Sequence, residues 1–100
     1  MAKILKQDAE RFLANVPEEN VFRCCDGRTF RNMEELSHAF STMGDEGFTY
    51  HANTEKNDFS NWVKDVIKDE KLARDIAKSQ NQTQAAKAVT DRVAFLSKKL

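Results

Sequence analysis

Apolar residues recur at helical spacing in five stretches of the chain. The clearest stretch begins at Asn57 or Asp58 and places five apolar residues on one helical face: Phe59, Trp62, Val63, Val66 and Ile67. Similar stripes occupy residues 3–15, residues 33–43, the segment after Asp69 and residues 83–99. The pattern therefore predicts about five amphipathic helices, each with one face available for a shared core.

Residue types at the ends of these stretches agree with the helical pattern. Asn32 with Glu35, and Asn81 with Gln84, have the spacing of a capping box, in which two side chains bind exposed backbone amides at a helix start. Gly44 is suited to end the helix that begins after Asn32. Local capping and the longer pattern therefore predict the same helices.

Residues 21–30, VFRCCDGRTF, instead show two short extended runs around Asp26 and Gly27. An Asp-Gly pair favours the positive φ angles of a tight hairpin turn. We therefore expect a small hairpin in which residues 21–25 pair with residues 28–30.

The segment after Gly44 is ambiguous. Asp45 can cap a short further helix, whereas Phe48, Thr49 and Tyr50 favour extended structure. The sequence leaves both conformations open.

Length and composition are those of one small domain. The chain has 100 residues, of which 40% are hydrophobic, and it holds three glycines and one proline. Such a chain can build one core and favours helices. We expect a single domain over residues 1–100, mainly α, formed as a compact bundle of about five helices with one small β-hairpin. A polar linker at residues 79–83 precedes the last helix, at about residues 83–99.

Charge and hydropathy argue against two classes of partner. The net charge is zero, which falls short of the concentrated positive field that nucleic-acid backbones select. The apolar runs are too short to span a bilayer, and charge interrupts the start of the chain too early for a signal peptide. We therefore expect a cytoplasmic protein with no membrane partner, for which nucleic acid is possible but not favoured.

The two cysteines, Cys24 and Cys25, are adjacent. Neighbouring residues on a strand point to opposite faces, so these thiols are expected to be reduced and to have difficulty reaching one tetrahedral metal ion. A metal site would also need His38 and His51 to converge on them, and neither C-x-x-C nor H-x-x-x-H spacing is present. The sequence therefore predicts no metal site, no cofactor and no catalytic cysteine.

His51 is the strongest candidate for a binding residue. Asn53, Asn57 and Asp58 follow it closely and could orient it as a base or ligand. The favoured alternative is structural: these side chains satisfy backbone groups in the loop and in the first turn of the next helix.

Five basic residues suggest a nucleic-acid surface along the two consecutive helices after Asn57: Lys64, Lys68, Lys71, Arg74 and Lys78. Acidic residues are interleaved with them, at Asp65, Asp69, Glu70 and Asp75. An ordinary solvated helix surface is therefore the favoured interpretation.

The sequence FRCCDGRTFRNMEELSHAF, followed by YHANTEKNDFSNWVKDVIKDEKLA, resembles a group of small uncharacterised prokaryotic proteins that are frequent in archaea. The resemblance runs from about Phe22 to Ala73 and includes the pattern H-x-N-x-x-x-N-D-F-x-x-W-V-x-D-V. It implies a compact, mostly helical domain of unassigned function, with a family-like core at about residues 22–78. It assigns no catalytic or ligand residue.

Together these patterns favour a non-enzymatic protein-interaction or regulatory module that binds a partner protein or a second copy of itself. The helix at residues 83–99 is the best interaction candidate, although it can also dock on its own domain. A nucleic-acid-associated protein is the first alternative. A small-molecule or metal site around His51 is the second.

Overall fold

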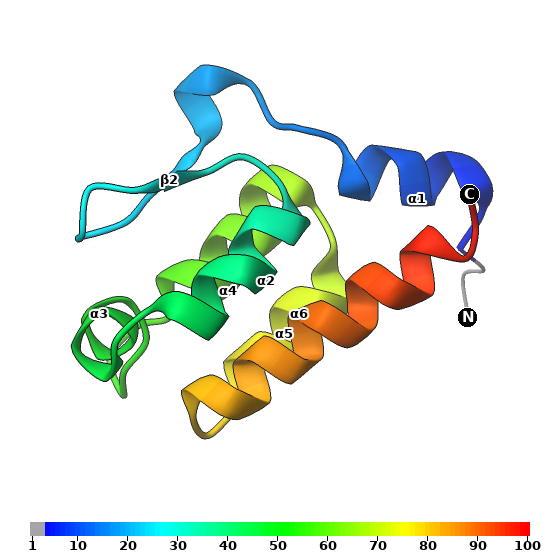
Figure 1. Ribbon diagram of the computed structural model, residues 1–100. Coiled ribbons are helices and arrows are strands. Elements are labelled where there is room, and N and C mark those ends of the chain that lie inside the picture. Colours follow the sequence, from blue (N-terminus) through cyan, green and yellow to red (C-terminus); the bar gives the residue numbers. More distant parts are fainter. Residues whose placement is uncertain (1–3) are drawn as a thin grey trace.

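The computed structural model describes residues 4–100, which form a mainly helical bundle with one small hairpin (Figure 1). The described part contains six α-helices, two strands, a 3₁₀ turn η1 and a π-helical turn η2. Their bounds are α1 Lys6–Leu13, η1 Glu18–Asn20, β1 Phe22–Arg23, β2 Thr29–Phe30, α2 Met33–Thr42, α3 Asp45–His51, α4 Asp58–Trp62, η2 Val63–Ile67, α5 Glu70–Lys78 and α6 Gln82–Ser97. The predicted fold class is confirmed. Residue 3, the first of the predicted N-terminal helix, lies outside the described residues.

The C-terminal helix α6 packs against three other helices, α1, α2 and α5 (Figure 1). Its buried apolar residues are Ala85, Val89 and Leu96. The polar linker before it is shorter than the predicted residues 79–83, because α6 already begins at Gln82. The Gln82 side-chain amide donates to the carbonyl oxygens of Phe40 and Met43, at 2.7 and 2.8 Å. The sequence left open whether this helix docks on its own domain or on a partner. In the structure it packs on its own domain.

Side-chain caps begin four of the helices. Asn32, Asn57, Asp69 and Asn81 each accept a hydrogen bond from the backbone amide three residues later. Helix α3 differs, because Gly44 rather than the predicted Asp45 occupies its cap position. The ambiguous segment is thus helical, with its two carboxylates in the first turn, where the helix dipole favours negative charge.

The hairpin is shorter than predicted and its turn is of another type. Phe22 pairs with Phe30, and the loop is closed where the Cys24 amide donates to the Arg28 carbonyl. Within the hairpin loop, only Gly27 takes a positive φ, +93°, so Asp26 does not adopt the mirror-image turn expected of an Asp-Gly pair. The Asp26 carboxylate instead accepts from the backbone amide of Arg28 at 3.0 Å, which favours a three-residue loop.

The predicted helix over residues 57–67 is continuous but changes type within its length. Its second half, η2, is π-helical, and Lys68 then takes a left-handed conformation with φ of +73°. The amides of Lys68 and Asp69 both donate to the Val63 carbonyl. This ending turns the chain so that Asp69 can start α5 in a new direction.

Aromatic side chains from the hairpin and the helices form one connected cluster. Phe59 lies 5.1 Å from Phe22 and 4.8 Å from Phe40, measured between ring centroids. Trp62 is buried and its indole N–H donates to the Asn20 carbonyl at 2.8 Å. The prediction that Phe59 and Trp62 belong to the core is confirmed.

A buried ion pair connects α5 to α6. Asp69 accepts two hydrogen bonds from the Arg92 guanidinium, at 2.7 Å from Nε and 3.0 Å from Nη2, and the two side chains are only 1% and 8% exposed. The same carboxylate caps α5 through the Leu72 amide. One acidic side chain therefore sets both the start of α5 and its position on α6.

We predict that Asp69→Asn or Arg92→Met lowers the free energy of unfolding by about 3–5 kcal/mol, because each change leaves one buried charge without its partner. Urea denaturation measures the loss. Lys71→Met is the matched control, since it removes an exposed pair with Asp75 and should cost at most about 1 kcal/mol. Equal losses in the three variants would contradict the role of burial.

Candidate functional site

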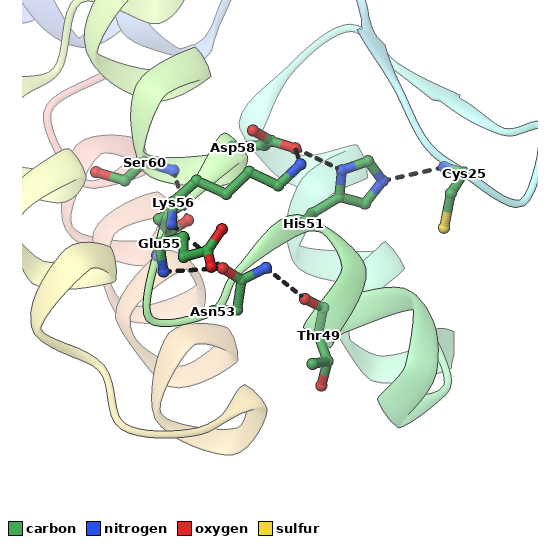
Figure 2. Close-up of polar contacts among 9 residues, drawn as sticks. Cys25, Thr49, His51, Asn53, Glu55, Lys56, Asp58 and Ser60 are labelled. Carbon is green, nitrogen blue, oxygen red and sulfur yellow. Dashed lines mark hydrogen bonds and ion pairs between the residues drawn. The ribbon is translucent and has the colours of Figure 1, made fainter.

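His51 lies in the last turn of α3 and joins three separate parts of the chain (Figure 2). Its Nε2 accepts a hydrogen bond from the Cys25 backbone amide at 3.0 Å. Its Nδ1 lies 2.9 Å from Oδ2 of Asp58, in the first turn of α4. The side chain is buried, and its ring contacts the rings of Phe22 and Phe59 edge to face. His51 thus connects the hairpin, α3 and α4 inside the aromatic cluster.

These two contacts define the protonation of the neutral ring. An amide N–H can only donate, so Nε2 carries the lone pair and Nδ1 carries the proton, which it donates to Asp58. Both ring nitrogens are therefore occupied within the protein. As placed here, His51 has no free nitrogen with which to act as a general base.

Asp58 is held ionised by its neighbours. Burial raises the pKa of its carboxyl, but hydrogen bonds from His51 and Lys56 and the charge of Lys56 outweigh this effect, so the pKa lies below its usual value. The Lys56 ammonium group lies 3.0 Å from the carboxylate. Asp58 therefore joins the predicted site through a direct contact with His51.

The two asparagines of the predicted site bind backbone groups instead. Asn53 accepts from the amides of Glu55 and Lys56 and donates to the Thr49 carbonyl, which shapes the loop between α3 and α4 (Figure 2). Asn57 caps α4 through the Ser60 amide. The geometry of both agrees with the structural alternative derived from the sequence.

The cysteines are nearer to His51 than the sequence suggested. Cys24 is buried, Cys25 is exposed, and both thiols are free. The two sulfurs and a ring nitrogen of His51 all lie within 4.8 Å of one another. The sequence-based expectation that Cys24 and Cys25 point to opposite faces assumed that both lie on a strand. The Cys24 carbonyl instead accepts a hydrogen bond from the Gly27 amide, so Cys25 lies in a turn. Side chains in a turn need not alternate between two faces.

The remaining cysteine and histidine features give no catalytic arrangement. Burial raises the pKa of the Cys24 thiol, which keeps it protonated and weakly nucleophilic. His38 is exposed on α2 and is not part of the group around His51. It lines a hollow of about 640 Å³ between the hairpin and α2, together with Phe30 and Glu35.

The five predicted nucleic-acid residues lie along two sides of α5. Lys64 and Arg74 line a hollow between α4 and α5, which Glu70 also lines. Lys78 lines a hollow between α5 and α6, and Lys71 pairs with Asp75 at 2.8 Å. Lys68 is exposed at the left-handed residue after η2. The basic charge is therefore divided and partly neutralised.

Sequence reasoning missed one exposed aromatic residue. Phe95 lies on α6 outside the buried stripe and is 41% exposed. The signal was present, because Phe95 does not fit the apolar face that contains Val89 and Leu96. The approach of Cys24 and Cys25 to His51 had no such signal, since it joins residues about 26 positions apart and depends on tertiary structure.

In the described part of the chain, residues 4–100, no helix combines the length and the apolar character that crossing a membrane requires.

We predict that His51→Ala lowers the free energy of unfolding by about 1–3 kcal/mol, because the Cys25 amide loses its acceptor and a cavity opens among the aromatic rings. Chemical denaturation gives the value. Tyr50→Ala is the control, since the adjacent Tyr50 is exposed and should change stability much less. A fully stable His51→Ala protein would contradict the structural role of His51.

A second prediction concerns how the contribution of Asp58 to stability depends on pH. The folded-state pKa of Asp58 lies below its value in the unfolded chain, so its contribution to stability is complete above about pH 5 and is lost as the pH falls through the folded-state pKa. Asp58→Asn removes this contribution. The stability difference between wild type and variant, measured by urea unfolding from about pH 6 to about pH 3, should therefore shrink on acidification. A difference that stays constant or grows would refute the assignment.

Comparison of the chain with protein-family models, curated proteins and solved structures finds no match. The resemblance to small prokaryotic proteins therefore stays a prediction, and the function must be inferred from the geometry.

Proposed function

We propose that this protein is a non-enzymatic interaction module that binds an acidic, partly apolar segment of a partner protein. The observation that carries the proposal is the placement of exposed apolar side chains. Of the four large hydrophobic residues exposed in residues 4–100, Leu5, Phe95 and Leu100 belong to the start of α1 and the end of α6. These two helices pack together, and the segments lie near one another in Figure 1. Exposed apolar groups on neighbouring segments favour protein binding.

Phe95 is the expected anchor of this terminal surface, which we define as Leu5, Phe95 and Leu100. Its ring lies 5.0 Å from the Lys99 ammonium and 5.3 Å from the Arg92 guanidinium carbon. It also lines a hollow of about 360 Å³ between α5 and α6. An aromatic ring beside a hollow and next to basic groups has the character of a binding hot spot.

The charge around the terminal surface favours an acidic partner. Lys98 and Lys99 follow Phe95, and neither forms an ion pair with any residue in the described range 4–100. The nearby carboxylates of Asp8 and Asp91 are already paired with other basic side chains. An incoming carboxylate could therefore add new pairs at the rim while apolar groups cover Phe95.

Nucleic-acid binding is less well supported than binding of a partner protein. The basic residues along α5 are divided between two sides and face carboxylates, whereas the terminal surface combines apolar area with unpaired positive charge. Binding to a nucleic-acid backbone depends on positive charge and would not use the exposed apolar side chains of the terminal surface.

Selection from a peptide-display library tests the proposal. We expect wild-type protein to enrich peptides that combine Asp or Glu with apolar residues, and their affinity should weaken with added salt. Phe95→Ser should weaken the selected peptides about tenfold or more, as measured by fluorescence anisotropy. Tyr50→Ser is the matched control, because Tyr50 is an exposed aromatic on the distant helix α3 and should leave binding unchanged.

Four outcomes would contradict the proposal. Selected peptides could lack acidic residues, or bind Phe95→Ser as tightly as wild type. Light scattering could instead reveal a dimer that Phe95→Ser dissociates, which would make a second copy the partner. Binding of a mixed-sequence oligonucleotide that depends on Lys64 and Lys71 but not on Phe95 would favour the nucleic-acid alternative.

A further inference from the structure

We propose that Cys24, Cys25 and His51 form a binding site for a thiophilic divalent cation such as Zn²⁺. The ligand atoms of the three residues lie within 4.8 Å of one another, although the sequence separates the cysteines from the histidine by about 26 positions. Two sulfurs and one imidazole nitrogen are a ligand set that Zn²⁺ prefers. This site is independent of the terminal surface and goes beyond the function proposed for it.

The separations are close to those that a tetrahedral ion requires. Zinc–sulfur bonds of about 2.3 Å and zinc–nitrogen bonds of about 2.0–2.1 Å place neighbouring ligand atoms roughly 3.4–3.8 Å apart. No pair of ligand atoms therefore has to approach by more than roughly 1.0–1.4 Å. Rotation of the exposed Cys25 side chain can supply much of this movement without disturbing the core.

The loop conformation allows both adjacent cysteines to take part. Cys24 is the first residue of a turn closed by its carbonyl and the Gly27 amide, and Cys25 is the second. Gly27 supplies the positive φ that returns the chain to β2. Because the turn interrupts the alternation of a strand, the two sulfurs can lie on the same side as the His51 ring.

Asp58 completes the arrangement around His51. Histidines that bind metal ions usually donate their other ring N–H to a carboxylate, which fixes the ring and strengthens the ligating nitrogen. His51 makes this contact, with Nδ1 and Asp58 Oδ2 2.9 Å apart, while Nε2 faces the Cys25 end of the hairpin turn (Figure 2). The Lys56 ammonium group also donates to Oδ2 of Asp58, at 3.0 Å.

Metal binding would release the thiol protons of Cys24 and Cys25 to solvent, because the cation binds the thiolates, and would exchange one existing hydrogen bond for coordination. Nε2 accepts the Cys25 amide, so the ion must displace that hydrogen bond. Water can take over the freed amide, because Cys25 is exposed. Three protein ligands leave a fourth position open to water or to a ligand from a partner, whereas a purely structural zinc site would be closed by four.

A Co²⁺ titration of the reduced protein in the absence of oxygen tests the site, with Zn²⁺ as competitor. We expect one ion per chain, with the charge-transfer absorption of cobalt–thiolate bonds, which Zn²⁺ then displaces. Cys25→Ser should lower this absorption and weaken binding about tenfold or more, while its exposed position preserves the fold. His38→Gln is the matched control, because His38 is the other histidine and lies outside the group.

Two further measurements separate the histidine from the cysteines. Asp58→Asn should weaken Zn²⁺ binding about tenfold to a hundredfold, since the carboxylate positions His51. In nitrogen-detected NMR, Zn²⁺ should shift the Nε2 resonance of His51 and expose the Cys25 amide to solvent exchange.

The site is overturned if Co²⁺ produces no thiolate absorption, if Cys25→Ser binds as wild type does, or if His38→Gln loses the signal. Half an ion per chain would show a site shared between two molecules and would also overturn it. Unchanged His51 resonances in the zinc-bound protein would exclude His51 as a ligand and overturn the proposed ligand set.

Discussion

The buried ion pair between Asp69 and Arg92 is the interaction on which the arrangement of the C-terminal half depends. Asp69 follows a left-handed residue, caps α5 and binds the guanidinium on α6 with both carboxylate oxygens. A charged carboxylate in this position would be strongly destabilising without its partner, because only the attraction to the guanidinium offsets the free-energy cost of removing the charge from water. The direction of α5 and its contact with α6 are therefore set together.

His51 has a similar role in the other half of the molecule, with a neutral ring in place of a charge pair. Its two nitrogens satisfy the Cys25 amide and the Asp58 carboxylate, so it holds the hairpin against α3 and α4. Among the described residues, no buried side-chain nitrogen or oxygen lacks a hydrogen-bond partner. The polar groups inside this small protein thus serve packing, and the same geometry that anchors the hairpin presents His51 to the two thiols.

The two proposed activities use different ends of the molecule. In Figure 1 the hairpin turn and the end of α6 lie on opposite sides of the bundle, whose longest dimension is 36 Å. An ion bound at the hairpin would bring together elements that contact the aromatic core. A partner bound at the terminal surface would instead contact α1 and α6, so each activity can be removed by mutation without touching the other.

Local chemistry in the sequence determined the helices, because the apolar spacing and the caps at Asn32, Asn57, Asp69 and Asn81 act within a few residues. It also determined that Phe59 and Trp62 are buried, and that a turn forms around Gly27. Tertiary structure alone decided that Asp69 meets Arg92 and that His51 meets Cys25, since these contacts join residues more than 20 positions apart. Helical period places Phe95 off the buried face of α6, but only tertiary structure decided that no other element covers it, because the period shows which residues share a face and not whether that face is covered.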